Sequence, residues 1–293
     1  MSRFLVKKRE SSSGEFAFEV VLKKVPLVTL FFILGCASPE KKIVFKSRVP
    51  TVESPLFNEN FQLGIATQLE SQRFEVELTR NLVNDFSFRK NGDIFSGDGD
   101  SLDIEGLDLG LTGALGKDLF AVQVEVSGDY FELKTGLGSL YPRSPSRWLL
   151  ALGGGVYRTA VDVRTGKCSI FCGSTSDSQA NQEIENRIET QQRGQEVKLS
   201  GTLGYRFAEK WIFFLGYSQM NYQYYALARD PTRSPAQIEF NENFRGEGYG
   251  GGFAFQAHRN FQMSLSAHNI AISWNEQRRE RAMGTLNLNW LFR

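Results

Sequence analysis

Few residues of this 293-residue chain have side chains suited to catalysis, since it contains two His and three Cys. His268 follows Gln262, Ser264 and Ser266 at every second position, and this spacing places all four on one face of a β-strand. A histidine beside a serine is one arrangement that activates a nucleophile. No neighbouring motif supplies the orienting group that catalysis also needs. We therefore interpret His268 as a structural hydrogen-bonding residue and predict no catalytic site.

Cys168 and Cys172 are separated by three residues within a long polar stretch. In an oxidising compartment this pair predicts a disulfide, although closing so small a ring restricts the unfolded chain little. Metal binding is not favoured, because no His or further Cys lies nearby. The acidic stretch 93–103 does not complete a calcium loop, since Leu109 stands where the required Glu would be. We predict neither a metal nor a cofactor.

The third cysteine, Cys36, follows an apolar run, Val25–Gly35, that two lysines precede. The run is too short to cross a bilayer as a helix, which needs about 20 residues, and it has the form of a secretory signal. The residues Ile33-Leu34-Gly35-Cys36 resemble the bacterial lipobox. The resemblance implies that residues 1–35 are a lipoprotein signal peptide. The polar stretch Met1–Val20, which a signal peptide does not need, indicates a start codon placed too early. The resemblance also implies that Cys36 is the acylated first residue, carrying palmitate, of an outer-membrane lipoprotein.

Downstream of a charged, proline-containing tether at 36–60, apolar and polar residues alternate, which predicts β-strands with two different faces. In the clearest strand Val197 and Leu203 share one face, and Lys198 and Thr202 share the other. The ten strands expected from this pattern cover residues 73–88, 102–115, 119–127, 130–140, 147–164, 195–207, 211–226, 246–257, 261–274 and 281–293. Eight strands are the alternative, if 119–140 is one bulged strand.

The connections between these strands differ in length at the two ends. Short turns are expected at 116–118, 208–210 and 258–260, and long polar loops at 165–193 and 227–245. Bacterial outer-membrane barrels have short turns in the periplasm and long loops outside the cell. The last strand, which ends in Phe292 and Arg293, resembles the terminal strand of that class. The resemblance implies an all-β fold over residues 61–293, an antiparallel transmembrane β-barrel of about ten strands.

In the whole chain 41% of residues are hydrophobic, but the mean hydropathy is only −0.30. This combination fits a protein made of strands in which only every second residue faces lipid. The competing fold is a soluble, lipid-tethered β-protein with its apolar face inward. The opposite face is rich in Ser, Thr, Gly, Asn and Gln, which favours a polar lumen. The side chains expected to fill this lumen as a polar network are Glu125, Glu132, Lys134, Arg158, Asp162, Lys198, Arg206 and His268.

A barrel this narrow holds little beyond its own side chains, which excludes a wide porin. We therefore rank first a non-enzymatic outer-membrane protein, with an envelope-structural role or an extracellular partner bound through loops 165–193 and 227–245. A narrow channel for small solutes ranks second, and an outer-membrane hydrolase that uses His268 ranks third. The expected partners are outer-membrane lipid and the barrel-assembly machinery. The net charge of +1 gives no reason to expect nucleic acid.

Overall fold

Antiparallel strands make up most of the computed structural model. The residues that it describes are 41–56, 62–70, 73–82, 86–91, 95–96, 103–104, 108–117, 120–126, 129–139, 146–165, 175–258 and 261–292. Ten strands build the larger sheet: β2 (Gln62–Glu70), β7 (Asp108–Lys117), β8 (Phe120–Val126), β9 (Tyr130–Leu137), β10 (Trp148–Arg158), β12 (Glu189–Ala208), β13 (Trp211–Arg229), β14 (Gln237–His258), β15 (Phe261–Trp274) and β16 (Gln277–Phe292).

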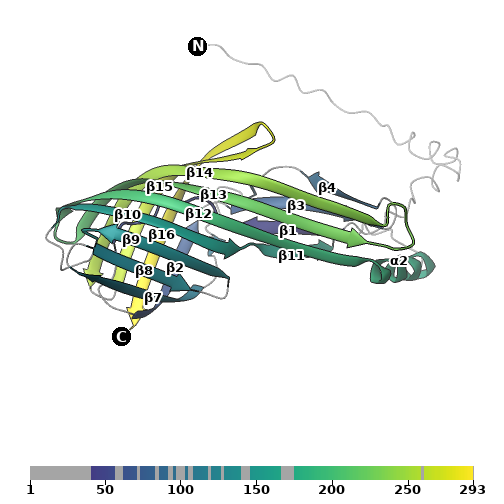
Figure 1. Ribbon diagram of the computed structural model, residues 1–293, viewed down its shortest axis with the longest axis horizontal. Coiled ribbons are helices and arrows are strands. Elements are labelled where there is room, and N and C mark those ends of the chain that lie inside the picture. Colours follow the sequence, from purple (N-terminus) through teal and green to yellow (C-terminus); the bar gives the residue numbers. More distant parts are fainter. Residues whose placement is uncertain are drawn as a thin grey trace, which may run out of the picture.

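These ten strands form a continuous cycle of antiparallel pairs. Each strand from β7 to β16 pairs with the next member of the sheet, and β2 pairs with β7 on one side and with β16 on the other. A short strand, β6 (Asp103–Ile104), adds to the end of β2. Figure 1 shows this barrel on the left, with the C-terminus at its lower rim. The predicted all-β antiparallel barrel is therefore confirmed.

The outward face of the barrel is apolar, whereas its inward face is mainly polar and carries one apolar cluster, formed by Leu149, Ile212, Phe214 and Ala254. Leu199, Leu203 and Leu215 are each more than half exposed, whereas Lys198 and Thr202, next to two of them in β12, are buried. The inward face carries the buried polar side chains Gln123, Glu132, Lys198, Thr202, Ser218, Gln256, Gln262, Ser264, Ser266, His268 and Thr285. A soluble barrel would show the reverse arrangement, so the competing fold with an inward apolar face does not describe this chain.

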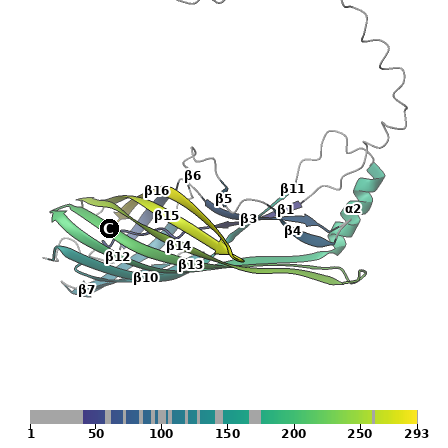
Figure 2. The ribbon, with the colours of Figure 1, turned by 90° about the horizontal axis from the view of Figure 1, so that it is seen from above.

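Strands β12, β13 and β14 continue beyond the barrel at the end opposite the C-terminus (Figure 1). A smaller sheet covers the inner face of this extension: β1 (Lys41–Ser47), β3 (Arg73–Asn81), β4 (Ser87–Asn91), β5 (Phe95–Ser96) and β11 (Ala160–Thr165). In this sheet β1 lies between β3 and β11. Figure 2 shows the two layers side by side, with helix α2 (Thr175–Arg187) at the far tip. We call this two-sheet extension the distal module.

An apolar core joins the two layers of the distal module. Phe45 stacks on Tyr224 with 4.8 Å between ring centroids, and Phe74 packs against Tyr222 and Phe244 at 4.7 and 5.7 Å. Rings at such distances add stabilisation beyond their burial. In the barrel, the apolar side chains of β12, β13 and β14 point outward, whereas in the distal module the apolar side chains of the same strands point inward. Among the described residues, no helix is long and apolar enough to cross a membrane.

Two sequence predictions about these segments were wrong. Residues 73–88 were expected in the barrel, but β3 lies in the distal module, and β2 supplies the barrel strand instead. The long loop at 227–245 is mainly strand, since β13 and β14 continue as a hairpin to Arg229 and Gln237. The reason is the core just described, because alternating aromatic residues in this hairpin gain a second sheet to pack against.

Candidate functional site

The lumen of the barrel is occupied by the chain itself. Residues 48–56, which connect β1 toward β2, pass through it without forming a strand, and we call them the lumen segment. Val49, Val52 and Leu56 of this segment are buried, with Val52 fully so. The barrel wall makes room with glycines: a Cβ on Gly248 would overlap the carbonyl of Pro50. Part of the predicted tether, residues 41–56, is therefore built into the fold.

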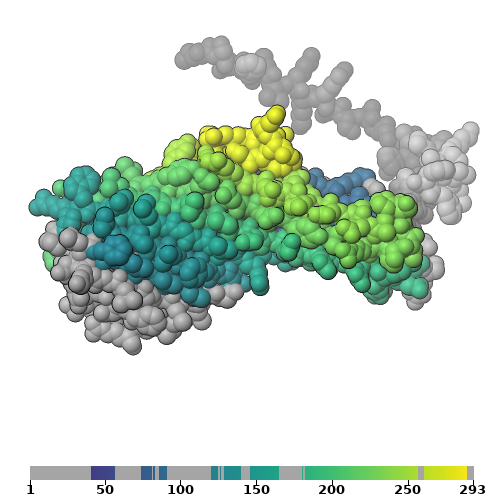
Figure 3. Space-filling view, in the orientation of Figure 1, coloured from purple at the N-terminus to yellow at the C-terminus, as the bar shows by residue number. Residues whose placement is uncertain are grey.

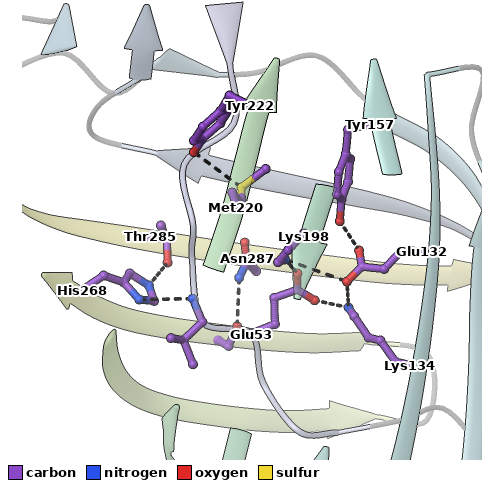
Figure 4. Close-up of polar contacts among 12 residues, drawn as sticks. Glu53, Glu132, Lys134, Tyr157, Lys198, Met220, Tyr222, His268, Thr285 and Asn287 are labelled. Carbon is purple, nitrogen blue, oxygen red and sulfur yellow. Dashed lines mark hydrogen bonds and ion pairs between the residues drawn. The ribbon is translucent and has the colours of Figure 1, made fainter. Parts of the chain in front are cut away.

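Glu53 of the lumen segment lies between two lysines of the wall (Figure 4). Its carboxylate accepts hydrogen bonds from Lys134 of β9 and Lys198 of β12. A second carboxylate, Glu132, lies 3.6 Å from Lys134 Nζ and 3.8 Å from Lys198 Nζ, and it also accepts a 2.8 Å hydrogen bond from Tyr157. Two positive and two negative charges thus balance each other. Such a cluster holds the segment in place, because each buried charge needs its partners.

Arg48 anchors the lumen segment at the end nearer the distal module. Its guanidinium lies over the rings of Tyr130 and Tyr157, 4.9 and 5.0 Å from their centroids. Its amide donates to Glu196 Oε2 at 3.3 Å, and its carbonyl accepts from the Tyr222 hydroxyl at 2.9 Å. Cation–π contacts and backbone hydrogen bonds therefore fix the direction in which the chain enters the barrel.

His268 faces the middle of the same segment, and its hydrogen bonds define its tautomer. The Val52 amide donates to Nδ1 at 3.3 Å, so Nδ1 carries no proton. In the neutral ring Nε2 then carries the proton and donates toward Ser266 Oγ at 2.8 Å or Thr285 Oγ1 at 2.9 Å. A general base for Ser266 would need the opposite arrangement, with Nε2 free to accept. The geometry is that of a structural hydrogen-bonding residue.

The structure brings together four of the eight predicted lumen residues, namely Glu132, Lys134, Lys198 and His268. Arg206 lies half-buried on the inward face of β12 near a turn, away from that cluster. The side chain of Glu125 lies outside the described residues.

The prediction that Arg158 and Asp162 face the lumen was wrong. Arg158 is exposed, because its neighbour Tyr157 is buried and alternate residues of β10 face opposite ways. Asp162 lies in β11, which leaves the barrel and pairs with β1, and it forms ion pairs with Arg164 and Lys46 there. The predicted lipidation site Cys36 and the predicted disulfide Cys168–Cys172 also lie outside the described residues.

Sequence reasoning missed the lumen segment and its Glu53. Pro50 and Pro55 made residues 48–56 look like a linker, because proline is rare within central strands. One signal pointed the other way. Glycines at the inward positions 204, 216 and 248 would each clash with the lumen segment if they carried a Cβ. Glycine inside a strand often marks a close approach of another backbone.

A second feature is a groove of about 640 Å³ on the outer wall, where the barrel meets the distal module. Its floor is formed by outward amides of β12, β13 and β14, including Gln195, Gln223 and Asn243. The β15–β16 hairpin forms one side with Trp274 and Arg278. Figure 3 shows this hairpin as a yellow ridge above the surface. The Trp274 ring stacks on Phe244 of the core, so the groups left for a ligand are the amides and the guanidinium, which suit a polar ligand with hydroxyl groups.

Comparisons with known proteins give no family. No protein-family model and no curated protein matches the sequence. Among solved structures, the attachment invasion locus protein Ail of Yersinia pestis is similar at 10% identity, with 87% of this chain and 100% of that chain covered and a TM-score of 0.29. The outer membrane protease OmpT from Escherichia coli is similar at 8% identity, with 88% and 100% covered and a TM-score of 0.27. Likenesses this weak carry no functional argument.

Proposed function

We propose that this chain is a non-enzymatic outer-membrane barrel that closes its own lumen and presents the distal module at the cell surface to bind a partner. The observation that supports it best is the lumen segment, which fills the barrel and neutralises its charges. A barrel with a filled lumen serves to anchor the distal module in the membrane. The lipid modification of Cys36 belongs to this proposal and rests on the lipobox alone.

The height of the apolar belt supports a membrane location. On β12 the belt runs from Val197 to Phe207, both of them exposed. A strand rises about 3.3 Å per residue, and a tilt of about 40° reduces the ten steps to a height of about 25 Å, the apolar band of outer-membrane barrels. Beyond Val197 the outward residue is Gln195, which lines the groove. The change from Val to Gln marks the water boundary.

The short turns support an orientation. Three of them, between β7 and β8, between β12 and β13 and between β14 and β15, lie at the end that also holds the C-terminus, whereas the two-residue turn between β15 and β16 lies at the other end. The opposite end carries the distal module and α2. In outer-membrane barrels the short turns face the periplasm, which would put the distal module outside the cell.

A channel is the weaker candidate because the lumen segment has no easy exit. Toward the turns, it would have to pull β1 out from between β3 and β11. Toward the distal module, residues 57–61 would have to follow it, and five residues span at most about 17 Å, less than the barrel height. Opening would therefore break either a strand pairing or the closure of the barrel.

A hydrolase is also a weaker candidate, because the lumen histidine His268 is already hydrogen-bonded within the fold. Both ring nitrogens have hydrogen-bond partners, and the side chain is buried beneath the lumen segment. The groove is the better place for a partner. It replaces the proposed loops 165–193 and 227–245, because α2 and the start of β12 make up most of the described part of the first range, and β13 and β14 make up most of the second.

The test compares the wild-type protein with a variant in which the wall pushes against the lumen segment. Gly248→Val would place a side chain onto the Pro50 carbonyl, whereas Gly284→Ala, in β16, meets only an ordinary contact of 3.8 Å. In planar bilayers we expect steady conductance from Gly248→Val and none from the wild type or Gly284→Ala. Steady conductance from the wild type would overturn the proposal.

A second readout does not depend on the width of the open lumen. In a background with the native cysteines replaced by serine, Thr51→Cys places a thiol on the buried part of the lumen segment. A small water-soluble maleimide should label it in Gly248→Val but not with the wild-type glycine. Equal labelling of both would show that the segment does not fill the lumen.

A further inference from the structure

We infer that the groove binds the sugar head group of a glycolipid from the membrane leaflet on the side of the distal module, while the acyl chains of the same molecule lie on the apolar belt. The inference rests on the proposed function for the location of the belt in the membrane. It names the occupant of the groove, which the amides and the guanidinium alone do not determine.

The groove is continuous with the lipid-facing belt on β12. Val197 is the upper end of the belt on this strand and also lines the groove, and the next outward residue, Gln195, lies in the floor of the groove. Leu199 is two residues below Val197 on the same face and is more than half exposed. Acyl chains that cover Leu199 therefore bring their head group to the groove.

On β13 and β14 the groove extends well above the belt. The exposed large apolar side chains of these strands end at Tyr217 and Tyr249, which pair across the two strands. Gln223 and Asn243 form another cross-strand pair, which lines the groove six residues further along each strand. Six residues rise about 20 Å along a strand, or about 15 Å above the belt at a tilt of about 40°.

This height distinguishes between kinds of lipid. The polar layer of a phospholipid bilayer adds only about 5–7 Å on each side of the hydrocarbon core. A phospholipid head group therefore reaches the lower part of the groove but not Gln223 and Asn243. A head group of two or more sugars can span the full height, and the amides of Gln223 and Asn243 provide both donors and acceptors for its hydroxyl groups.

The charged side chains beside the groove favour hydroxyl groups over a bare anion. Arg245 Nη2 lies 2.8 Å from Glu247 Oε1, and Arg278 Nη1 lies 3.9 Å from the other oxygen of Glu247. Arg278 Nε also donates to Glu280 at 2.7 Å. These four charges balance, so together they add no net positive charge for an anion. The same contacts connect β14 to β16 and hold the side of the groove in a fixed position.

The experiment measures which lipid the folded protein retains. The protein is refolded in vesicles that contain equal amounts of phosphatidylethanolamine and diglucosyl diacylglycerol, whose head group has two sugars. It is then extracted with a detergent that has no sugar head group, and the bound lipid is identified by mass spectrometry. We expect the wild type to retain the glycolipid and not phosphatidylethanolamine. Retention of both lipids equally, or of neither, would overturn the inference.

A double variant removes the upper amides of the groove. Gln223→Leu combined with Asn243→Leu should lower the retained glycolipid roughly tenfold, because the hydrogen bonds of both amides are lost. Gln191→Leu is the matched control, since this exposed side chain lies four residues before Gln195 on the same face of β12 and outside the lining of the groove. It should retain as much glycolipid as the wild type. Equal retention by the double variant and the control would also overturn the inference.

A soluble sugar distinguishes a lipid from a free saccharide as the occupant. The disaccharide without acyl chains should displace little of the bound glycolipid at the same concentration, because it gains nothing from the belt. Displacement as complete as that by added glycolipid would assign the groove to a soluble sugar and overturn the inference.

The orientation of the barrel is tested separately. Arg279→Cys, an exposed position of the β15–β16 hairpin, is treated with a membrane-impermeant maleimide in a background with Cys168 and Cys172 replaced by serine. We expect labelling on intact cells. Labelling only after lysis would overturn the proposed orientation, whereas the retained lipid would still decide what the groove binds.

Discussion

At the scale of single residues, balanced buried charges hold the lumen segment in the barrel. Glu53 is the only acidic residue of the lumen segment, and it bridges Lys134 and Lys198, which come from strands that are not neighbours in the barrel. Lys198 is almost fully buried. Removing one partner from a buried ion pair costs about 3–5 kcal/mol, because the remaining charge keeps its desolvation penalty.

Glu53→Gln should therefore lower stability by several kcal/mol and weaken the hold on the lumen segment. The readout is the temperature at which the folded, fast-migrating form disappears on a detergent gel. Glu209→Gln, on an exposed turn, is the matched control and should not change it. The combined change Glu53→Leu, Glu132→Gln, Lys134→Met and Lys198→Met, which removes all four charges of the cluster, should recover part of the loss. If Glu53→Gln alone behaved like the control, the ion pairs would not hold the segment.

Another single residue organises the outer tip of the molecule. Asp230 lies in the turn of the β13–β14 hairpin and accepts hydrogen bonds from the Thr232 hydroxyl at 2.7 Å and its amide at 3.0 Å. Arg187 of α2 and Arg233 each lie 3.0 Å from its other oxygen. Hydrogen bonding from Thr232, followed by that from Arg187, holds the pKa of this carboxyl well below its usual range.

A carboxyl with a lowered pKa stabilises the fold above its unfolded value of about 3.9, and this contribution is lost as the pH falls through the lowered pKa. The tip should thus be protected from amide exchange at pH 7 and keep that protection down to about pH 4. Asp230→Asn should speed exchange of the Thr232 amide at pH 7 and leave the barrel strands unchanged. Exchange that is equally slow in the variant would show that the charge does not order the tip.

At the scale of strands, β12, β13 and β14 change character along their length. In the barrel their apolar residues, such as Leu203, face outward; in the distal module their apolar residues, such as Tyr222, face inward. The backbone alternation does not change at the boundary, since the register between these strands runs on without a shift from Gln195 to Arg206. Only the types of side chain on the two faces are exchanged at the boundary. The same strand can therefore face lipid in the barrel and water in the distal module.

A pair of arginine substitutions on outward positions tests this boundary. Leu203→Arg lies within the belt and should cost about 2–4 kcal/mol if it is near the bilayer midplane. Gln223→Arg lies on the outward face above the boundary and should cost little. The fraction of folded, heat-modifiable protein in the membrane measures both. Equal loss in the two variants would mean that the belt does not face lipid. Thr202→Arg is not a suitable control, because this side chain is buried in the filled lumen.

Period-two alternation predicted most barrel strands, because each strand must separate a lipid face from a polar face. Five expected ranges, from 195–207 to 281–293, match β12 to β16 apart from their ends. The same pattern misplaced 73–88, since β3 also alternates and only its pairing with β1 shows that it belongs elsewhere. The candidate site was harder to predict. Lys198 and His268 follow from strand faces, but their partner Glu53 comes from a segment with no strand pattern.

At the scale of the whole molecule, the barrel and the distal module share one framework. Strands β12 to β14 run through both, and the lumen segment joins β1 of the module to the barrel interior. No flexible linker intervenes in these three strands, so the groove keeps a fixed height and direction above the membrane (Figure 1).

The outward polar side chains directly above the apolar belt also set the bilayer thickness that suits this protein. Gln195, Gln219 and Glu247 are the first outward polar side chains above the belt on their three strands. Replacing each with Leu or Val would lengthen the apolar belt by two residues, which raises it by about 5 Å at a tilt of about 40°. Mismatch costs a fraction of a kcal/mol for each Å. Such a variant should partition into thicker bilayers. These three side chains therefore help to match the height of the apolar belt to the thickness of the membrane.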